Sequence, residues 1–103
     1  MKKLLLLAAL CCLAFGATAT ASEHRSGEDV YETYCHTCHA TGVAGAPKFG
    51  DHEAWKPLIA KGVDQLVEVA KSGKGAMPPM GTCSDCSMDE LEAAVKYMVE
   101  NSQ

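Results

Sequence analysis

The sequence predicts an all-α fold with about four short helices, on the basis of three observations. Apolar residues recur at helical spacing in several segments, and no run of alternating β-branched residues indicates a strand. The chain has 103 residues, and once a leader of 21 residues is set aside, the remaining 82 are few for a stable apolar core. A chain of this size usually needs a disulfide, a metal or a cofactor to stabilise its fold, and the four cysteines outside the leader are the candidate residues for it.

The first 21 residues have the layout of a secretory signal peptide. Lys2 and Lys3 supply a positive start, an apolar run covers 4–15, and a small-residue cleavage site ends at Ala21. The apolar run has 12 residues, whereas a membrane span needs roughly 20, so a permanent anchor is the weaker alternative. We expect a signal peptide at 1–21, a flexible start at 22–26 and one domain at 27–103, exported to the periplasm.

Three helices are expected in the first part of that domain, each with a local signal. Ser26 can cap the first helix, whose acidic start complements the helix dipole. Pro57 removes a backbone hydrogen bond from the second helix, so that helix is short or bent. The three helices run from Glu28 to Cys35, from the cap residue Asp51 to about Lys61, and from Val63 to Gly73.

The last helix has the strongest signal. Ser87 and Glu90 have the spacing of a capping box, in which each side chain accepts a hydrogen bond from the other's backbone. Apolar residues then recur at helical spacing as far as Glu100. The segment before this helix, 73–86, holds too many glycines and prolines to be helical.

Composition excludes several classes of function. Outside the leader, seven basic residues stand against thirteen acidic ones, a formal charge of −6. This balance leaves no basic patch for nucleic acid, and the length leaves no room for a sizeable enzyme. The net charge predicts a partner with a basic face and an association rate that falls as salt is added.

The first two cysteines outside the leader lie in Cys35-His36-Thr37-Cys38-His39, the attachment pattern of c-type haem. Two thiols three positions apart lie on one helical turn, where they can reach the two vinyl groups along a porphyrin edge. His39 follows directly and can present an imidazole nitrogen to the iron, whereas His36 points elsewhere. We therefore expect one haem c, joined covalently through Cys35 and Cys38, with His39 as an iron ligand.

Three alternatives use the same cysteines. Cys35 and Cys38 could form a structural disulfide, or a thioredoxin-like redox pair, although no βαβ setting is visible. A zinc site could combine them with Cys83 and Cys86. In that case 44 residues would separate the two pairs, well beyond the roughly 15–20 of the common zinc pattern, and His39 would have no role.

The second axial position decides what the iron can do. Iron bound only by His39 would be open to oxygen or nitric oxide, whereas a methionine closes the position and raises the reduction potential. Met98 belongs to the apolar stripe of the last helix, and Met88 lies in its first turn. Met77 and Met80 lie instead beside two prolines, in a segment suited to holding a side chain over a flat cofactor. A methionine that simply fills the core is the general alternative.

Four motifs follow one another along the chain: the cysteine–histidine motif at 35–39, a glycine- and proline-containing segment at 42–51, Gly75-Ala76-Met77-Pro78-Pro79, and Cys83-x-x-Cys86. Together they resemble the cytochrome c5 group of class I c-type cytochromes, over about 27–98. The resemblance implies the small class I cytochrome c fold, with its N- and C-terminal helices crossing each other. It further implies that Met77 is the distal iron ligand, that Pro47 packs near His39, and that Trp55 lies close to the haem edge.

The resemblance also implies a disulfide between Cys83 and Cys86, which would pin the ligand segment to the start of the last helix. A redox-active bridge is the alternative. The chain departs from the family pattern at Met80, where a polar or basic residue usually follows the double proline, so Met80 is a second candidate ligand. His24 and His52 are expected to be surface histidines.

These residues together predict an electron carrier rather than an enzyme, because two axial ligands leave no open coordination site. We expect it to carry single electrons between redox proteins, from a membrane-bound donor to a terminal oxidase or reductase, with transient proximity to the membrane and no nucleic acid. The chain is expected to be a monomer or a weak homodimer. A gas-binding or peroxidatic haem protein is the alternative if the methionine bond is absent, and a subunit of a fixed redox assembly is another.

Overall fold

The computed structural model describes residues 24–103, so the expected signal peptide at 1–21 lies outside the described residues. Every regular element in this range is helical, and the one strand-like feature there is a backbone bridge between Lys74 and Met77. The all-α prediction is confirmed. No helix between residues 24 and 103 is long and apolar enough to cross a membrane.

The first helical segment is longer than the sequence indicated. α1 (Gly27–Val30), the π-helical turn η1 (Tyr31–Cys35) and α2 (His36–His39) follow without a break, because both junctions keep right-handed helical backbone angles. The turn is π-helical because the His36 N–H donates to the Tyr31 carbonyl, five residues back. The segment therefore carries the whole 35–39 motif. Apolar spacing could not predict this, since the residues after the turn are mostly polar.

Three further helices complete the four that the sequence predicted. They are α3 (His52–Ile59), which contains Pro57 and is short as expected, α4 (Val63–Ser72) and α5 (Met88–Glu100). Two 3₁₀ turns, η2 (Val43–Gly45) and η3 (Pro79–Thr82), lie in the connecting segments.

Side-chain caps fix where three of the helical segments begin, as predicted. Ser26 and Asp51 each accept a hydrogen bond from the backbone N–H three residues on, at 3.0 and 3.2 Å. At α5 the capping box is complete. The Ser87 hydroxyl accepts from the Glu90 N–H at 3.0 Å, and the Glu90 carboxylate accepts from the Ser87 N–H at 2.9 Å.

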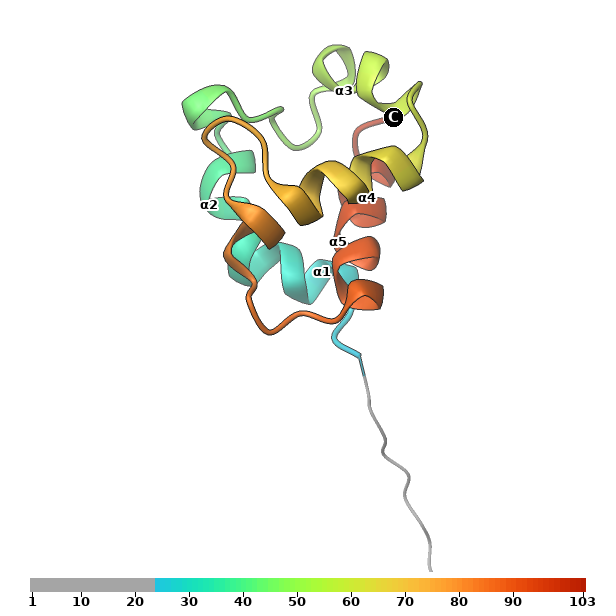
Figure 1. The fold of residues 1–103 in the computed structure, drawn as a ribbon. Helices are drawn as coiled ribbons and strands as arrows, with labels where there is room; N and C mark the ends of the chain where they lie inside the picture. Colours follow the sequence, from blue (N-terminus) through green and yellow to red (C-terminus); the bar gives the residue numbers. More distant parts are fainter. Residues whose placement is uncertain (1–23) are drawn as a thin grey trace, which may run out of the picture.

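α1 and α5 cross in contact with each other, as the family resemblance implied (Figure 1). The crossing is close at Gly27, where an added Cβ would overlap the carbonyl of Ala93 in α5 and lie 3.1 Å from the Cβ of Tyr97. Only glycine lets the two backbones approach this far. Beside the crossing, the core joins α5 to side chains from η1, α3 and α4: Tyr31, Trp55, Val67, Ala70, Leu91, Val95, Met98 and Val99.

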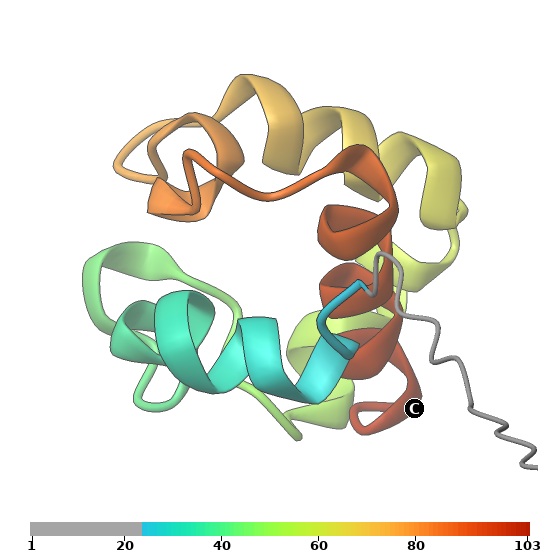
Figure 2. The same cartoon turned by 90° about the horizontal axis from the view of Figure 1, so that it is seen from below.

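The helices leave two groups of segments facing each other across one side of the domain. Figure 2 shows α2 and the loop that follows it at lower left, the segment 74–82 at upper left, and α5 to the right of both. The first group carries the cysteine–histidine motif, and the second carries Met77 and Met80.

Candidate functional site

A cavity of about 920 Å³ lies between these two groups of segments. Its size is near the upper end of the roughly 300–1,000 Å³ typical of ligand and cofactor pockets. Every residue that the sequence analysis assigned to the cofactor lines it: Cys35, Cys38, His39, Pro47, Trp55 and Met77. The structure thus brings together residues that are spread over more than 40 positions of the chain.

The two cysteines lie one helical turn apart on the same helix. Cys35 ends η1 and Cys38 lies in α2, and both are half-buried free thiols. Burial raises the pKa of the Cys35 thiol to about 11. Its surroundings therefore favour an uncharged sulfur, which suits a thioether bond better than a metal-bound thiolate.

The imidazole of His39 is held in one orientation. The side chain is buried, and its Nδ1 lies 2.8 Å from the Pro47 carbonyl oxygen. Because a carbonyl only accepts hydrogen bonds, Nδ1 carries the hydrogen, so in the neutral tautomer that this bond selects Nε2 keeps its lone pair. The Phe49 N–H donates to the His39 carbonyl at 2.6 Å and fixes the same loop from the other side. Hydrogen bonding of the second ring nitrogen is the usual arrangement for a metal-binding histidine.

Trp55 forms part of the cavity wall beside this histidine. Its side chain is buried, with ring centroids of Trp55 and His39 6.1 Å apart, and its indole N–H donates to the Lys48 carbonyl at 2.9 Å. The indole therefore ties α3 to the loop that holds Pro47.

Met77 is presented by a tight turn. Its backbone N–H and carbonyl both pair with Lys74, at 2.9 Å each, and the segment packs against Gly73 at the end of α4. Met77 lines the cavity, whereas Met80, three residues on, does not. Of the other candidates, Met98 is a buried core residue that also touches the cavity, and Met88 is exposed. Met77 can therefore reach a cofactor in the cavity, whereas Met80 cannot, a distinction that the residues alone had not made.

The remaining histidines have no place in the site. His24, His36 and His52 are all exposed, and none of them lines the cavity. This agrees with their interpretation as surface residues.

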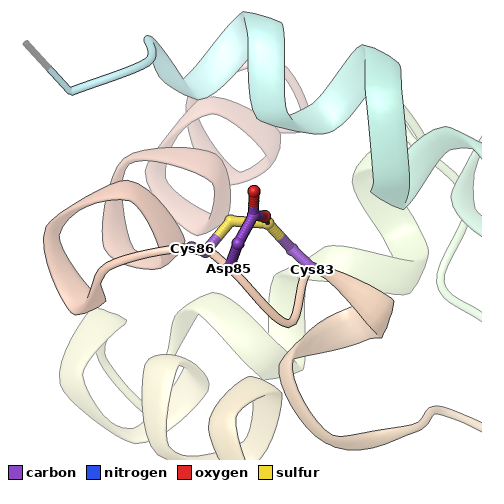
Figure 3. A group of neighbouring side chains, drawn as sticks. All are labelled: Cys83, Asp85 and Cys86. Carbon is purple, nitrogen blue, oxygen red and sulfur yellow. Dashed lines mark hydrogen bonds between the residues drawn. A yellow bond between two sulfur atoms is a disulfide. The ribbon is translucent and has the colours of Figure 1, made fainter.

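Cys83 and Cys86 form the disulfide that the family resemblance implied, with their Cα atoms 5.4 Å apart (Figure 3). Asp85 lies beside the two sulfurs, so these three side chains are close enough together to suggest a metal site. Sulfurs bonded to each other cannot also be thiolate ligands. The four-cysteine zinc alternative is therefore wrong, and so is a metal at this cluster.

Arg25 is a structural residue that the sequence analysis missed. It lies in the stretch expected to be a flexible start, yet its guanidinium Nε and backbone N–H donate to the Glu90 carboxylate at 3.0 and 2.8 Å. Its Nη2 lies 3.3 Å from an Asp85 oxygen and 3.8 Å from each sulfur of the disulfide. Arg25 is the sole arginine in the sequence, and that was the available signal.

The residues present fit a covalently attached haem. The cavity combines two free thiols on one turn, a buried imidazole whose Nδ1 is bonded to the Pro47 carbonyl, and a thioether on the facing segment. Most of the other lining residues are apolar or glycine, as expected for the walls around a porphyrin.

Comparison with known proteins gives matches over most of the chain. The family model described as cytochrome C oxidase, cbb3-type, subunit III matches residues 22–98. Cytochrome c5 of Azotobacter vinelandii is 55% identical over 76 residues, which cover 72% of this chain and 92% of that protein. Cytochrome c5 of Ectopseudomonas mendocina is 45% identical over 84 residues, covering 80% and 97%.

Solved structures agree with these sequence matches. A chain from the crystal structure of an electron-transfer complex of nitrite reductase with cytochrome c is 47% identical and aligns with a TM-score of 0.73, over 75% of this chain and 94% of that one. A mono-haem ferrocytochrome c from Shewanella putrefaciens is 41% identical with a TM-score of 0.68, over 80% and 100%.

Proposed function

Because the chain belongs to the cytochrome c5 group of class I monohaem c-type cytochromes, we propose that it is a periplasmic electron carrier whose iron is bound by His39 and Met77. The family membership makes it an electron carrier with one covalently bound haem c, and not an enzyme. The pair of iron ligands, His39 and Met77, and the periplasmic location are what we propose.

One observation carries the ligand assignment. The bond from Nδ1 of His39 to the Pro47 carbonyl selects the tautomer whose Nε2 can bind iron, in a cavity that Met77 also lines. Haem bound there supplies an iron that takes up and releases a single electron, and a methionine ligand raises its reduction potential. Met80 does not line the cavity, which favours Met77 as that ligand.

The chain's own residues keep this site rigid. Cys35 and Cys38 tether the ring, while the Pro47 carbonyl and the Trp55 indole fix the imidazole side of the cavity. The double backbone pairing of Lys74 with Met77 fixes the other side. Rigid walls suit an electron carrier, because ligands that do not move between the two oxidation states leave little to reorganise.

Three observations support export to the periplasm. Residues 1–21 have the layout of a cleavable signal peptide, and the family match begins at residue 22, directly after the proposed cleavage site. The Cys83–Cys86 disulfide fits an oxidising compartment. Mass spectrometry of the protein from the periplasmic fraction tests this, with a mature chain beginning at Ser22 as the expected result.

The partners of such a carrier are other redox proteins. A structural relative was solved in an electron-transfer complex with nitrite reductase, which supports a reductase as one class of acceptor for this chain. Encounters of this kind typically bury less than about 1,200 Å².

The test uses holoprotein made in a host that attaches haem. We expect a reversible one-electron titration and no carbon monoxide binding to the reduced protein, because both axial positions are filled. Met77→Ala should open one position, so this variant should bind carbon monoxide and have a lower reduction potential. Met80→Ala, the matched control, should behave like the parent. Ready carbon monoxide binding by the parent protein would instead support a gas-binding function.

A further inference from the structure

Cleavage of the signal peptide after Ala21 would leave Ser22-Glu23-His24 as the start of the mature chain. A histidine in the third position from a free amino terminus completes a set of four nitrogen donors: the terminal amine, the next two amide nitrogens and Nδ1 of the imidazole. Neither Glu23 nor His24 is a proline, so both amide nitrogens carry a hydrogen that a metal can displace. In the uncleaved chain the nitrogen of Ser22 is an amide, so cleavage itself would complete the set.

Four nitrogen donors in one plane select the metal. Square-planar nitrogen sites are typical of Cu(II) and Ni(II), and Cu(II) is the more tightly bound of the two in the general order of affinities. Zn(II) prefers a tetrahedral set of ligands, which consecutive backbone nitrogens do not provide. Binding releases the hydrogens of the donors to the solvent, so occupancy of such a site rises with pH.

The imidazole of His24 has the surroundings that this role requires. The side chain is exposed, its Nε2 lies 3.6 Å from a carboxylate oxygen of Asp89, and its Nδ1 lies 3.5 Å from the Ser87 hydroxyl. A carboxylate only accepts hydrogen bonds, whereas a hydroxyl can donate, so these neighbours favour the neutral tautomer with the hydrogen on Nε2 and the lone pair on Nδ1. The Ser87 oxygen also accepts from the Glu90 N–H, so the cap of α5 does not depend on His24.

The chain is anchored directly after this histidine. The backbone N–H and the guanidinium Nε of Arg25 donate to the Glu90 carboxylate at 2.8 and 3.0 Å. The Arg25 N–H is not one of the four donors, so the anchor removes no ligand. Within residues 24–103 the His24 N–H has no hydrogen-bond partner, and this is an amide nitrogen that the metal needs. The anchor therefore places His24 beside the first turn of α5 and leaves its donor atoms available.

Resting on the cleavage site in the proposed function, we propose that the mature amino terminus is a Cu(II) site. Its ligands are the Ser22 amine, the amide nitrogens of Glu23 and His24, and Nδ1 of His24. Asp89 accepts a hydrogen bond from Nε2 of the bound ring and orients it, as carboxylates do for other metal-binding histidines. His24 does not line the haem cavity, so this site is separate from the iron.

The probe is Cu(II) sulfate, added to oxidised holoprotein from the periplasmic fraction with glycine as a weak competing chelator. Electron paramagnetic resonance follows the copper, because its hyperfine pattern distinguishes four nitrogen ligands from sets that contain oxygen. We expect the parent protein to bind one equivalent with the four-nitrogen signal. His24→Ala should lose this signal. His52→Ala is the matched control, because it removes another exposed histidine outside the cavity, and it should keep the signal.

Two further variants test the spacing and the carboxylate. Inserting one serine directly after Ser22 keeps every side chain but moves the histidine to the fourth position, so the four-nitrogen signal should be lost. Asp89→Asn keeps all four ligands and removes the charge beside Nε2. Copper affinity should then fall about tenfold, the lower end of the effect of a partner behind a metal-binding histidine, because this pair is exposed.

Mass spectrometry of the same samples separates this proposal from the cleavage on which it rests. A parent chain that begins at Ser22 and gives no four-nitrogen signal would overturn the copper site alone. A chain that begins elsewhere would overturn the cleavage site and the copper site together, while the one-electron titration of the haem still tests the electron carrier. Retention of the signal in His24→Ala or in the insertion variant would place copper on other residues and contradict the proposal. Unchanged affinity in Asp89→Asn would contradict the role of Asp89.

Discussion

Replacing Gly73 by alanine should weaken the iron–methionine bond without touching either ligand. Gly73 ends α4 with φ +84° and ψ 163°, a backbone region used almost exclusively by glycine. An added Cβ would lie 2.7 Å from the Met77 carbonyl oxygen and 2.8 Å from the Pro79 nitrogen. Both are backbone atoms of the segment that presents Met77, so the whole segment must move to make room.

Two costs add up in this variant. Holding alanine in such a backbone conformation costs about 1–3 kcal/mol, and overpacking against fixed backbone typically costs another 1–3 kcal/mol. Gly62 is the matched control, because it has φ +93° and ψ 147° but nothing within 4 Å of an added Cβ. Gly62→Ala should therefore carry the first cost alone and leave the methionine in position.

The assay is denaturant unfolding of oxidised holoprotein, followed by far-UV circular dichroism and by the weak far-red absorption of the iron–thioether bond. We expect the free energy of unfolding to fall further in Gly73→Ala than in Gly62→Ala, and the far-red absorption to be weakened or lost in Gly73→Ala only. Equal stability of the two variants, with the absorption intact in both, would refute the inference that Gly73 positions Met77.

Three further predictions concern stability. Gly27→Ala should lower the free energy of unfolding by about 1–3 kcal/mol through the clash with the Ala93 carbonyl, while Glu28→Ala on the exposed side of the same turn should change it little; equal effects would argue against a close α1–α5 crossing. The hydrogen bonds from Arg25 hold the pKa of the Glu90 carboxyl well below its ordinary value of 4.5, so its stabilisation is complete above that pH and is lost as the pH falls through the lowered pKa. Acid titration of stability by circular dichroism should therefore be less steep for Glu90→Gln, and an unchanged profile would contradict the pairing. Reducing the Cys83–Cys86 bridge, which closes a loop of four residues, should cost about 2 kcal/mol in denaturant unfolding and weaken the far-red iron–thioether absorption, because the bridge pins the ligand segment to the start of α5; unchanged stability and absorption would contradict that role.

Features specified by neighbouring residues were predictable from the sequence. The caps at Ser26, Asp51 and Ser87 depend on side chains and backbone groups three residues apart, and each forms where it was expected. The spacing of Cys35 and Cys38 likewise predicts one helical turn, because the covalent geometry of the porphyrin edge demands it.

Features that depend on contacts between distant residues were not predictable. The residues alone could not separate Met77 from Met80, and only the family resemblance favoured Met77; that Met77 lines the cavity and Met80 does not depends on the path of a segment that packs against Gly73 at the end of α4. Arg25 was read as part of a flexible start because its partner Glu90 is 65 positions away.

Proton NMR of the reduced holoprotein tests the ligand assignment most directly. A methionine bound to the iron lies over the porphyrin face, where the ring current shifts its methyl and methylene protons far upfield of all others. With selectively labelled methionine, we predict that these shifted signals belong to Met77 and persist in Met80→Ala. Assignment of the shifted methyl to Met80, or the absence of any such methyl, would contradict the account.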